Sequence, residues 1–285
     1  MTSSLANKVV IITRATSGIG AAAAAAFVQA GARVALAARS AERLDALADK
    51  LGGPEHALAV PTDVTQAEEC DRLARLTMQR FGRVNILVNN AGIGHWARFN
   101  DLTETETRRF VEVNILGVMN MTHAALPRMR RQRSGVLINV ASMMAYLGTP
   151  MTSVYSATKF AVRGFSQALR LELAGDGIEV VCFCPGHTDT DFFAHSVVRG
   201  ARWHHGLQKP MSPTEVARRL LAVAVRPQPE VVLTAEGRAM TFTARHFPRL
   251  AAWGAKTFFD RSDKASASSS PLRGWNWIRN GLQRK

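Results

Sequence analysis

Cysteine is scarce in this 285-residue chain, and long apolar runs are absent. The three cysteines, Cys70, Cys182 and Cys184, are too few and too oddly spaced for a disulfide framework, so we expect buried thiols in a reducing compartment. Gln29 and Arg33 interrupt one of the longest apolar stretches, and none approaches the length that crosses a membrane. Residues 1–8 are polar and contain no apolar signal core. These absences favour a cytoplasmic protein.

Clusters of metal ligands and motifs for nucleic acid are also missing from the sequence. His204 and His205 are adjacent, and neighbours in sequence rarely converge on one ion, so no metal site is expected. The chain has no helix-turn-helix, zinc-ligand or RNA-binding pattern, which argues against a nucleic-acid partner.

Acidic residues are outnumbered, with 22 of them against 36 lysines and arginines and a net charge of +14. More than half of this excess lies in residues 237–285, where ten basic residues face only Asp260 and Asp263. A solvated basic tail is the simplest interpretation. Nucleic acid, anionic lipid or an acidic partner protein are the alternatives.

Short apolar runs alternate with longer helical patterns as far as about residue 234. The expected strands are Lys8–Thr13, Arg33–Ala38, His56–Pro61, Val84–Asn89, Gly135–Val140, Ile178–Cys184 and Val231–Thr234. The expected helices are Gly18–Ala30, Ala41–Leu51, Gln66–Arg80, Glu104–Arg131, Ser153–Leu173 and Pro213–Val225. This alternation predicts an α/β fold with a doubly wound, Rossmann-like parallel sheet, whose ligands bind beyond the carboxyl ends of the strands.

The same pattern predicts one domain followed by an extension. Residues 1–235 form the expected dinucleotide-binding and catalytic domain, and residues 236–285 form a basic C-terminal extension that contains aromatic residues. Within the extension, Lys264–Pro271 is rich in serine and alanine and is predicted to be a flexible linker.

A glycine-containing turn follows the first expected strand. It runs from Thr13 to Gly20 with the sequence T-R-A-T-S-G-I-G and opens a helix. Glycines at such a turn let the backbone approach a pyrophosphate at the helix N-terminus. A helix that merely packs tightly on its strand would have the same pattern, so this motif alone does not establish a nucleotide site.

The end of the second strand indicates which nucleotide fits. An NAD enzyme places an acidic residue there for the ribose 2′-hydroxyl, but here the strand ends Ala37-Ala38-Arg39-Ser40. The Arg39 side chain can instead form a bidentate contact with a 2′-phosphate. The alternative is a surface arginine at the start of a helix.

A tyrosine and a lysine lie one helical turn apart at Tyr155 and Lys159. Tyrosine is a poor base at neutral pH, and a nearby lysine cation is expected to lower its pKa. Ser142 follows the fifth strand, where its hydroxyl can hold a substrate oxygen. Asn114 lies among apolar neighbours in the long helix and needs a polar partner.

These motifs, in this order, resemble those of the short-chain dehydrogenase/reductase family over about residues 5–235. The resemblance implies a catalytic tetrad of Asn114, Ser142, Tyr155 and Lys159. It implies cofactor contacts, here to NADP(H), from Thr13, Arg14, Ser17, Gly18, Ile19, Gly20, Arg39, Asp63, Val64, Asn90, Ala91, Gly92, Tyr155, Lys159, Pro185, Gly186, Thr188 and Thr190. A homo-oligomer through the helices that carry Asn114 and Tyr155 is a further family expectation.

The resemblance also implies the role of each member of the tetrad. Tyr155 exchanges a proton with the substrate oxygen while a hydride moves between the nicotinamide and a carbonyl/alcohol carbon. Ser142 orients and polarises that oxygen, Lys159 binds the nicotinamide ribose and tunes Tyr155, and Asn114 holds a water of the proton relay.

Arg14 departs from the family pattern, which has glycine at this position of the turn. Three consequences are open: Arg14 reaches the 2′-phosphate beside Arg39, it points harmlessly to solvent, or it weakens or abolishes cofactor binding. The third favours a rival function, a non-catalytic NADP(H)-binding or scaffold protein with the same fold.

By analogy, the substrate cleft is large and apolar, which favours a bulky hydrophobic carbonyl compound or alcohol. The residues expected to line it are Gly94, His95, Trp96, Met143, Met144, Leu147, Phe192 and Phe193. A mobile lid is expected around Trp203, His204 and His205. Each of these side chains is equally compatible with an ordinary core position.

The extension mixes aromatic and basic residues, among them Trp253, Phe258, Phe259, Trp275, Trp277 and Ile278. This composition fits peripheral association with an anionic membrane. Packing over the substrate cleft or onto a partner subunit fits equally well.

Overall fold

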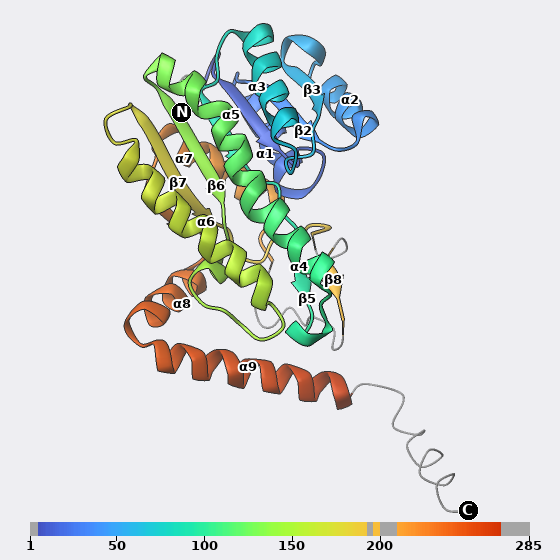
Figure 1. Ribbon diagram of the computed structural model, residues 1–285, viewed down its shortest axis with the longest axis vertical. Coiled ribbons are helices and arrows are strands. Elements are labelled where there is room, and N and C mark those ends of the chain that lie inside the picture. The colour runs from blue at the N-terminus through green and yellow to red at the C-terminus, as the bar shows by residue number, and fades with distance from the viewer. Residues whose placement is uncertain (1–4, 193–195, 200–209, 269–285) are drawn as a thin grey trace, which may run out of the picture.

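A seven-stranded parallel sheet forms the centre of the computed structural model, which describes residues 5–192, 196–199 and 210–268 (Figure 1). The strand order is β3-β2-β1-β4-β6-β7-β9, so the doubly wound Rossmann-like prediction is confirmed. The strands are β1 (Val9–Thr13), β2 (Arg33–Ala38), β3 (Ala57–Pro61), β4 (Ile86–Asn89), β6 (Gly135–Val140), β7 (Ile178–Cys184) and β9 (Glu230–Val232).

Helices cover both faces of this sheet, and alternate residues of each strand point to opposite layers. On β1, Val10 and Ile12 pack with α1 (Gly18–Gln29), α2 (Ala41–Lys50) and α7 (Pro213–Val225). Ile11 points the other way, toward α3 (Ala67–Phe81), α5 (Gly117–Gln132) and α6 (Ser153–Glu172). Burial on both faces explains why the strands read as continuous apolar runs.

The three cysteines are buried and form no disulfide, as predicted. Cys182 and Cys184 share one face of β7, with their sulfur atoms 3.8 Å apart.

The long helix expected over Glu104–Arg131 is interrupted, so that prediction was wrong as a continuous α-helix. It divides into α4 (Glu104–Val111), a turn of π-helix over Glu112–Leu116, and α5. Asn114 lies in the π-helical turn, fully buried, with hydrogen bonds to residues of other elements. Such turns are inserted where tertiary contacts outweigh the regular hydrogen-bond ladder, and hydrophobic periodicity does not reveal them.

A small second sheet was not predicted. In it β5 (His95–Trp96) pairs in parallel with β8 (Val197–Val198). Each strand has only two residues, too short to produce an alternating pattern.

Two helices follow β9, α8 (Ala235–His246) and α9 (Pro248–Ser268). The flexible linker expected over Lys264–Pro271 is wrong as far as Ser268, because α9 continues through it, and residues 269–271 lie outside the described chain. Alanine and lysine extend an existing helix at low cost, so their composition does not end it. No helix in the described ranges is long and apolar enough to cross a membrane.

Gly177, the residue before β7, tests how the start of this strand packs against the end of α5. Gly177 has a φ of +68°, and a Cβ there would lie 2.4 Å from the Arg133 carbonyl oxygen. We expect Gly177→Ala to lower the free energy of unfolding by at least about 2 kcal/mol, through left-handed strain and this clash. Urea unfolding measures the change.

The matched control is Gly164→Ala in α6, where an added Cβ meets no atom within 4 Å. This change should raise the free energy of unfolding by about 0.5–1 kcal/mol, the ordinary helix-propensity gain. Equal effects of the two substitutions would contradict the packing of Gly177.

Candidate active site

A cavity of about 690 Å³ lies at the carboxyl ends of β1, β4, β6 and β7. The predicted catalytic and cofactor residues that line it are Arg14, Ser17, Gly18, Ile19, Asn90, Gly92, Ser142, Tyr155, Lys159, Pro185, Gly186, Thr188 and Thr190. Its lining does not include Thr13, Gly20, Arg39, Asp63, Val64, Ala91 or Asn114. The structure therefore brings most of the predicted catalytic and cofactor residues into the lining of one cavity, and the others do not line it.

The glycine turn presents the N-terminus of α1 to this cavity. The cap residue Ser17 makes no side-chain hydrogen bond to the helix, and the first turn contains no acidic residue. At Gly20, a Cβ would lie 2.2 Å from the Arg14 carbonyl oxygen, so only glycine permits this close packing. The uncapped amides and the helix dipole fit an anion such as a pyrophosphate.

Thr13 joins the glycine turn to the loop that follows β4. Its hydroxyl accepts hydrogen bonds from the backbone N–H groups of Asn90, at 2.9 Å, and Ala91, at 2.8 Å. The Asn90 side chain in turn donates to the Thr13 carbonyl oxygen at 3.0 Å. Thr13 and Ala91 thus fix the position of two cavity walls without lining the cavity themselves.

Arg14 points into the cavity and not to solvent, which removes one of its three interpretations. Its backbone has a φ of +50°, in the left-handed region that non-glycine residues rarely adopt. Its guanidinium donates to the Gly92 carbonyl oxygen at 3.1 Å and lies 5.2 Å from the Phe192 ring centroid. Burial lowers the pKa of Arg14, while interactions with Tyr155 and Asp191 act in the opposite direction.

Three predicted cofactor residues lie near the ends of β2 and β3. Arg39 is exposed and close enough to Arg14 and Asp63 for electrostatic interaction. The Asp63 carboxylate accepts hydrogen bonds from both the backbone and the hydroxyl of Thr65, at 3.0 and 2.8 Å. Val64 is buried and packs beside Gly117.

Tyr155 and Ser142 meet across the cavity, because α6 packs against the end of β6. The Ser142 hydroxyl also accepts from the Met144 N–H at 3.2 Å, which fixes the turn after the strand. Burial raises the pKa of Tyr155 to about 12, although its hydrogen bond with Ser142 and the charge of Arg14 favour the phenolate. The net lowering of this pKa that was expected from Lys159 is therefore not seen, because burial outweighs it.

The ammonium of Lys159 is held at the end of β6 by a backbone carbonyl. Its Nζ donates to the Val140 carbonyl oxygen at 3.0 Å and lies 5.7 Å from the centre of the Tyr155 ring. The residue is only 5% exposed, and burial lowers the pKa of Lys159 to about 8. With this pKa the amine is still mostly protonated at neutral pH, so Lys159 keeps its positive charge beside Tyr155.

Asn114 is held by three hydrogen bonds at the π-helical turn. Its Oδ1 accepts from the Ile93 N–H at 2.8 Å, and its Nδ2 donates to the Ile93 carbonyl at 2.9 Å and to Thr158 Oγ1 at 3.0 Å. Its side chain thus ties the loop after β4 to α6, one residue before Lys159. This is the polar partnership that a buried asparagine requires.

His95, predicted as a substrate contact, has a structural role as well. It lines the cavity, and its Nε2 accepts a hydrogen bond of 3.0 Å from the backbone N–H of Tyr155 in the first turn of α6. Burial lowers the pKa of His95, which favours the neutral form that this bond requires. The sequence offered no sign of this cap, because the two residues are 60 positions apart.

A family model described as short chain dehydrogenase matches residues 8–198 of the chain. The chain belongs to the short-chain dehydrogenase family. An uncharacterized oxidoreductase of Staphylococcus aureus (strain USA300) is 37% identical over 224 residues, which cover 79% of this chain and 94% of the relative. The chain is accordingly an oxidoreductase of this family.

Two solved structures of the short-chain dehydrogenase fold are similar at 29% identity. One is an alcohol dehydrogenase from Thermococcus sibiricus complexed with 5-hydroxy-NADP, with a TM-score of 0.71 over 79% of this chain and 95% of that one. The other is a 3-ketoacyl-(acyl-carrier-protein) reductase from Brucella melitensis complexed with NADH, with a TM-score of 0.73 over 80% and 97%.

In this short-chain dehydrogenase, the helices of the C-terminal extension complete the cavity. Of the predicted substrate residues, the structure places Gly94, His95, Trp96, Met143, Met144, Leu147 and Phe192 in the lining, whereas Phe193, Trp203, His204 and His205 lie outside the described residues. Helices α8 and α9 add Glu236, Met240, Thr243, Leu250, Ala251, Gly254, Ala255 and Phe259. Of the open interpretations of the extension, packing over the cleft is the one observed for α8 and α9.

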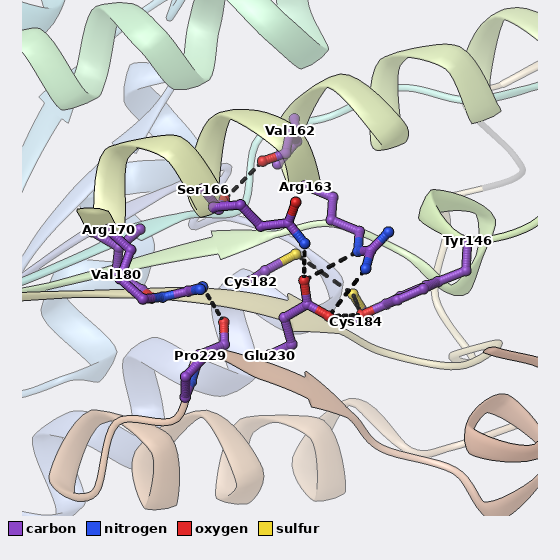
Figure 2. Close-up of polar contacts among 11 residues, drawn as sticks. Tyr146, Val162, Arg163, Ser166, Arg170, Val180, Cys182, Cys184, Pro229 and Glu230 are labelled. Carbon is purple, nitrogen blue, oxygen red and sulfur yellow. Dashed lines mark hydrogen bonds and ion pairs between the residues drawn. The ribbon is translucent and has the colours of Figure 1, made fainter. Parts of the chain in front are cut away.

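Sequence reasoning missed a second polar network, which lies beside α6, the helix that carries Tyr155 (Figure 2). Glu230, on the edge strand β9, accepts hydrogen bonds from Tyr146 at 2.9 Å, Arg163 at 3.1 Å and Gln167 at 2.6 Å. Arg163 also lies 4.1 Å from the centre of the Tyr146 ring. One carboxylate thus links α6 to the turn that Ser142 begins.

Glu230 should stabilise the protein in a pH-dependent way. Burial opposes its ionisation, but hydrogen bonds from Gln167, Arg163 and Tyr146 outweigh burial and hold its pKa below the ordinary value. We expect Glu230→Gln to cost about 1–3 kcal/mol of unfolding free energy at pH 7. Because the folded pKa is the lower one, this difference should shrink as the pH falls below about 4.3.

Urea unfolding of both proteins across this pH range measures the difference. The matched control is Glu104→Gln, whose ion pair with Arg108 is exposed on both sides and should contribute little at any pH. A cost of Glu230→Gln that stays constant from pH 7 down to about pH 3 would contradict the assigned charge.

Proposed function

We propose that this oxidoreductase transfers a hydride between NADP(H) and a bulky, hydrophobic carbonyl/alcohol pair, with Tyr155 as proton donor and acceptor. The observation that carries the proposal is the continuity of the cavity. It joins the anion-binding start of α1 to Ser142, Tyr155 and Lys159, and continues between apolar walls. A dinucleotide and a hydrophobic substrate can therefore meet beside one acid/base group.

The residues around the glycine turn fit the proposed cofactor. The uncapped N-terminus of α1 suits the pyrophosphate. Exposed Arg39, at the end of β2 where an acid would select NAD, suits a 2′-phosphate. Arg14, within electrostatic range of Arg39, carries a second positive charge in the same region.

When bound, the nicotinamide supplies the hydride. In the reducing direction Tyr155, which is protonated at neutral pH and whose pKa burial raises further, gives its hydroxyl proton to the substrate oxygen. Ser142 holds the same oxygen through its hydroxyl, beside Tyr155. In the oxidising direction the substrate hydroxyl returns a proton to the phenolate.

Lys159 and Asn114 support this proton transfer from behind. Lys159 donates one ammonium hydrogen to the Val140 carbonyl oxygen. Its other hydrogens can bind a ribose hydroxyl, and its charge can stabilise the Tyr155 phenolate. Asn114 bonds Ile93 in the loop after β4 and Thr158 of α6. These groups are thereby held in place around the position proposed for a relay water beside Lys159.

The walls beyond Tyr155 support a large apolar substrate. Trp96, Met143, Met144 and Phe192 line the cavity, and the Phe192 ring lies 5.9 Å from that of Tyr155. Flexible methionines adapt to irregular ligands, and the ring pair restricts the approach to Tyr155.

A homo-oligomer remains part of the proposal, through the helices that carry Asn114 and Tyr155. These helices expose four large apolar side chains, Val111, Leu116, Phe160 and Leu171, with 38%, 46%, 42% and 80% of their surfaces accessible. Contact with a second copy would remove this surface from water.

Tyr155→Phe tests the catalytic assignment. Removing the hydroxyl should lower turnover of hydrophobic ketones by about 10²–10⁴-fold, the usual contribution of a general acid/base, while NADPH still binds. Fluorescence titration with NADPH and steady-state rates measure the two effects separately. Turnover within about twofold of the unaltered chain would contradict the role of Tyr155.

Arg39→Ala tests the cofactor preference. Loss of a charge-assisted contact to the 2′-phosphate should weaken NADPH binding about 10–100-fold and leave NADH binding unchanged. Arg43→Ala, an exposed arginine of α2, is the matched control and should change neither affinity. Equal loss for both nucleotides would contradict 2′-phosphate recognition by Arg39.

A second candidate function is a non-catalytic nucleotide-binding or scaffold protein, and Arg14 is the observation that favours it. Its guanidinium lines the cavity and bonds the Gly92 carbonyl oxygen, so it narrows the space beside the glycine turn. The same titration separates the candidates. Absence of affinity for both NADPH and NADH would remove the enzyme proposal, whereas binding without turnover of any hydrophobic ketone or alcohol would favour the scaffold.

A further inference from the structure

The outward side of helices α8 and α9 carries an unusual group of exposed apolar side chains. Phe242, Phe247, Leu250 and Trp253 lie within twelve residues, and 59%, 55%, 55% and 66% of their surfaces are accessible. Large apolar side chains are normally buried, and several exposed together mark a contact surface. We call Arg238, Phe242, Arg245, Phe247, Arg249, Leu250, Trp253 and Lys256 the outer face.

The outer face is distinct from the side of these helices that packs on the protein. Met240 and Thr243 of α8, and Ala251 and Gly254 of α9, line the cavity on the inner side. On α8, Arg238, Phe242 and Arg245 recur at helical spacing; on α9, Arg249, Trp253 and Lys256 do the same. Each helix therefore has one face for the cavity and another that contains rings and cations.

The charges of the outer face have one predominant sign. Arg238, Arg245, Arg249 and Lys256 are all exposed. Of the two acidic residues in this part of the helices, Asp260 is bound to Lys256 at 2.6 Å, and Glu236 lines the cavity. The rings are thus surrounded by cations, a combination that suits an anionic surface with an apolar interior.

The outer face also adjoins the cavity. Leu250 is more than half exposed and yet lines the cavity, so it belongs to both surfaces. Figure 1 shows α9 at the end of the molecule remote from β1, β2 and β3, where a planar surface could approach it.

We propose that the outer face of α8 and α9 docks on an anionic lipid membrane. Phenylalanine, leucine and tryptophan enter the boundary between headgroups and acyl chains, and the arginines and lysine contact lipid phosphates. A second copy of the same face is disfavoured, because a twofold contact would bring the three arginines of one copy toward those of the other. The inference does not depend on the proposed hydride transfer.

The test uses the full chain with sedimenting vesicles of phosphatidylcholine, with and without phosphatidylglycerol. We expect binding only to the vesicles that contain phosphatidylglycerol, weakened by added salt. Phe242→Ser/Trp253→Ser should reduce this partition at least about tenfold. Arg238→Gln/Arg245→Gln/Arg249→Gln should reduce it about a hundredfold, at roughly 1 kcal/mol for each charge near the surface.

The matched control is Phe99→Ser/Leu171→Ser, which removes two side chains that are 66% and 80% exposed elsewhere on the protein. It should leave vesicle binding unchanged. The inference is overturned if Phe242→Ser/Trp253→Ser binds vesicles as the unaltered chain does, or if no variant sediments differently from the control.

Two further outcomes would assign the outer face to another partner. If sedimentation velocity without lipid shows an oligomer that only Phe242→Ser/Trp253→Ser dissociates, the face joins copies of the chain. If heparin or duplex DNA competes with vesicles and loses affinity in the same double variant, the face binds polyanions. Either result, without direct lipid binding, overturns the proposal.

Discussion

Much of the site depends on one buried cation, the ammonium of Lys159. Taking it out of water is costly, so its position must provide polar partners. The Val140 carbonyl at the end of β6 is one of these, at 3.0 Å. This bond fixes α6 against the strand end, and Tyr155, one turn earlier on α6, is thereby held beside Ser142. The interrupted helix serves the same arrangement, since Asn114 at the π-helical turn bonds Thr158, the neighbour of Lys159.

Burial and the charge of Arg14 both influence the ionisation of Tyr155 and Lys159. Burial favours neutral forms of both Tyr155 and Lys159, whereas the Arg14 charge favours the phenolate and disfavours the ammonium. Arg14 packs on Phe192, and Phe192 packs on Tyr155, so one column of side chains crosses the cavity from the glycine turn to Tyr155. Any molecule that displaces Arg14 also changes the surroundings of Tyr155.

Supporting contacts surround this centre on two sides. The carboxylate of Glu230 binds Arg163 of α6 and Tyr146 of the turn after β6. It thereby holds the helix that carries Tyr155 next to the turn that carries Ser142. On the open side, α8 and α9 place small residues such as Ala251 and Gly254 against the cavity and large ones such as Trp253 toward solvent. Ala251 and Gly254 leave room for a ligand beside Met240 and Phe259, and Trp253 belongs to the outer face that we assign to lipid.

The sequence by itself determined the parallel sheet and the positions of the motif residues. Arg14 directly follows β1, and Ser142 lies two residues after β6, so local order along the chain places both at the carboxyl edge of the sheet, while Tyr155 and Lys159 lie on α6. It did not determine the direction of Arg14, the π-helical turn at Asn114 or the continuation of α9 through Ser268. Tertiary structure also decided the partners of His95 and Glu230, which lie 60 and 84 positions from Tyr155 and Tyr146. Contacts between such distant segments depend on packing in three dimensions, and neither periodicity nor spacing along the chain encodes them.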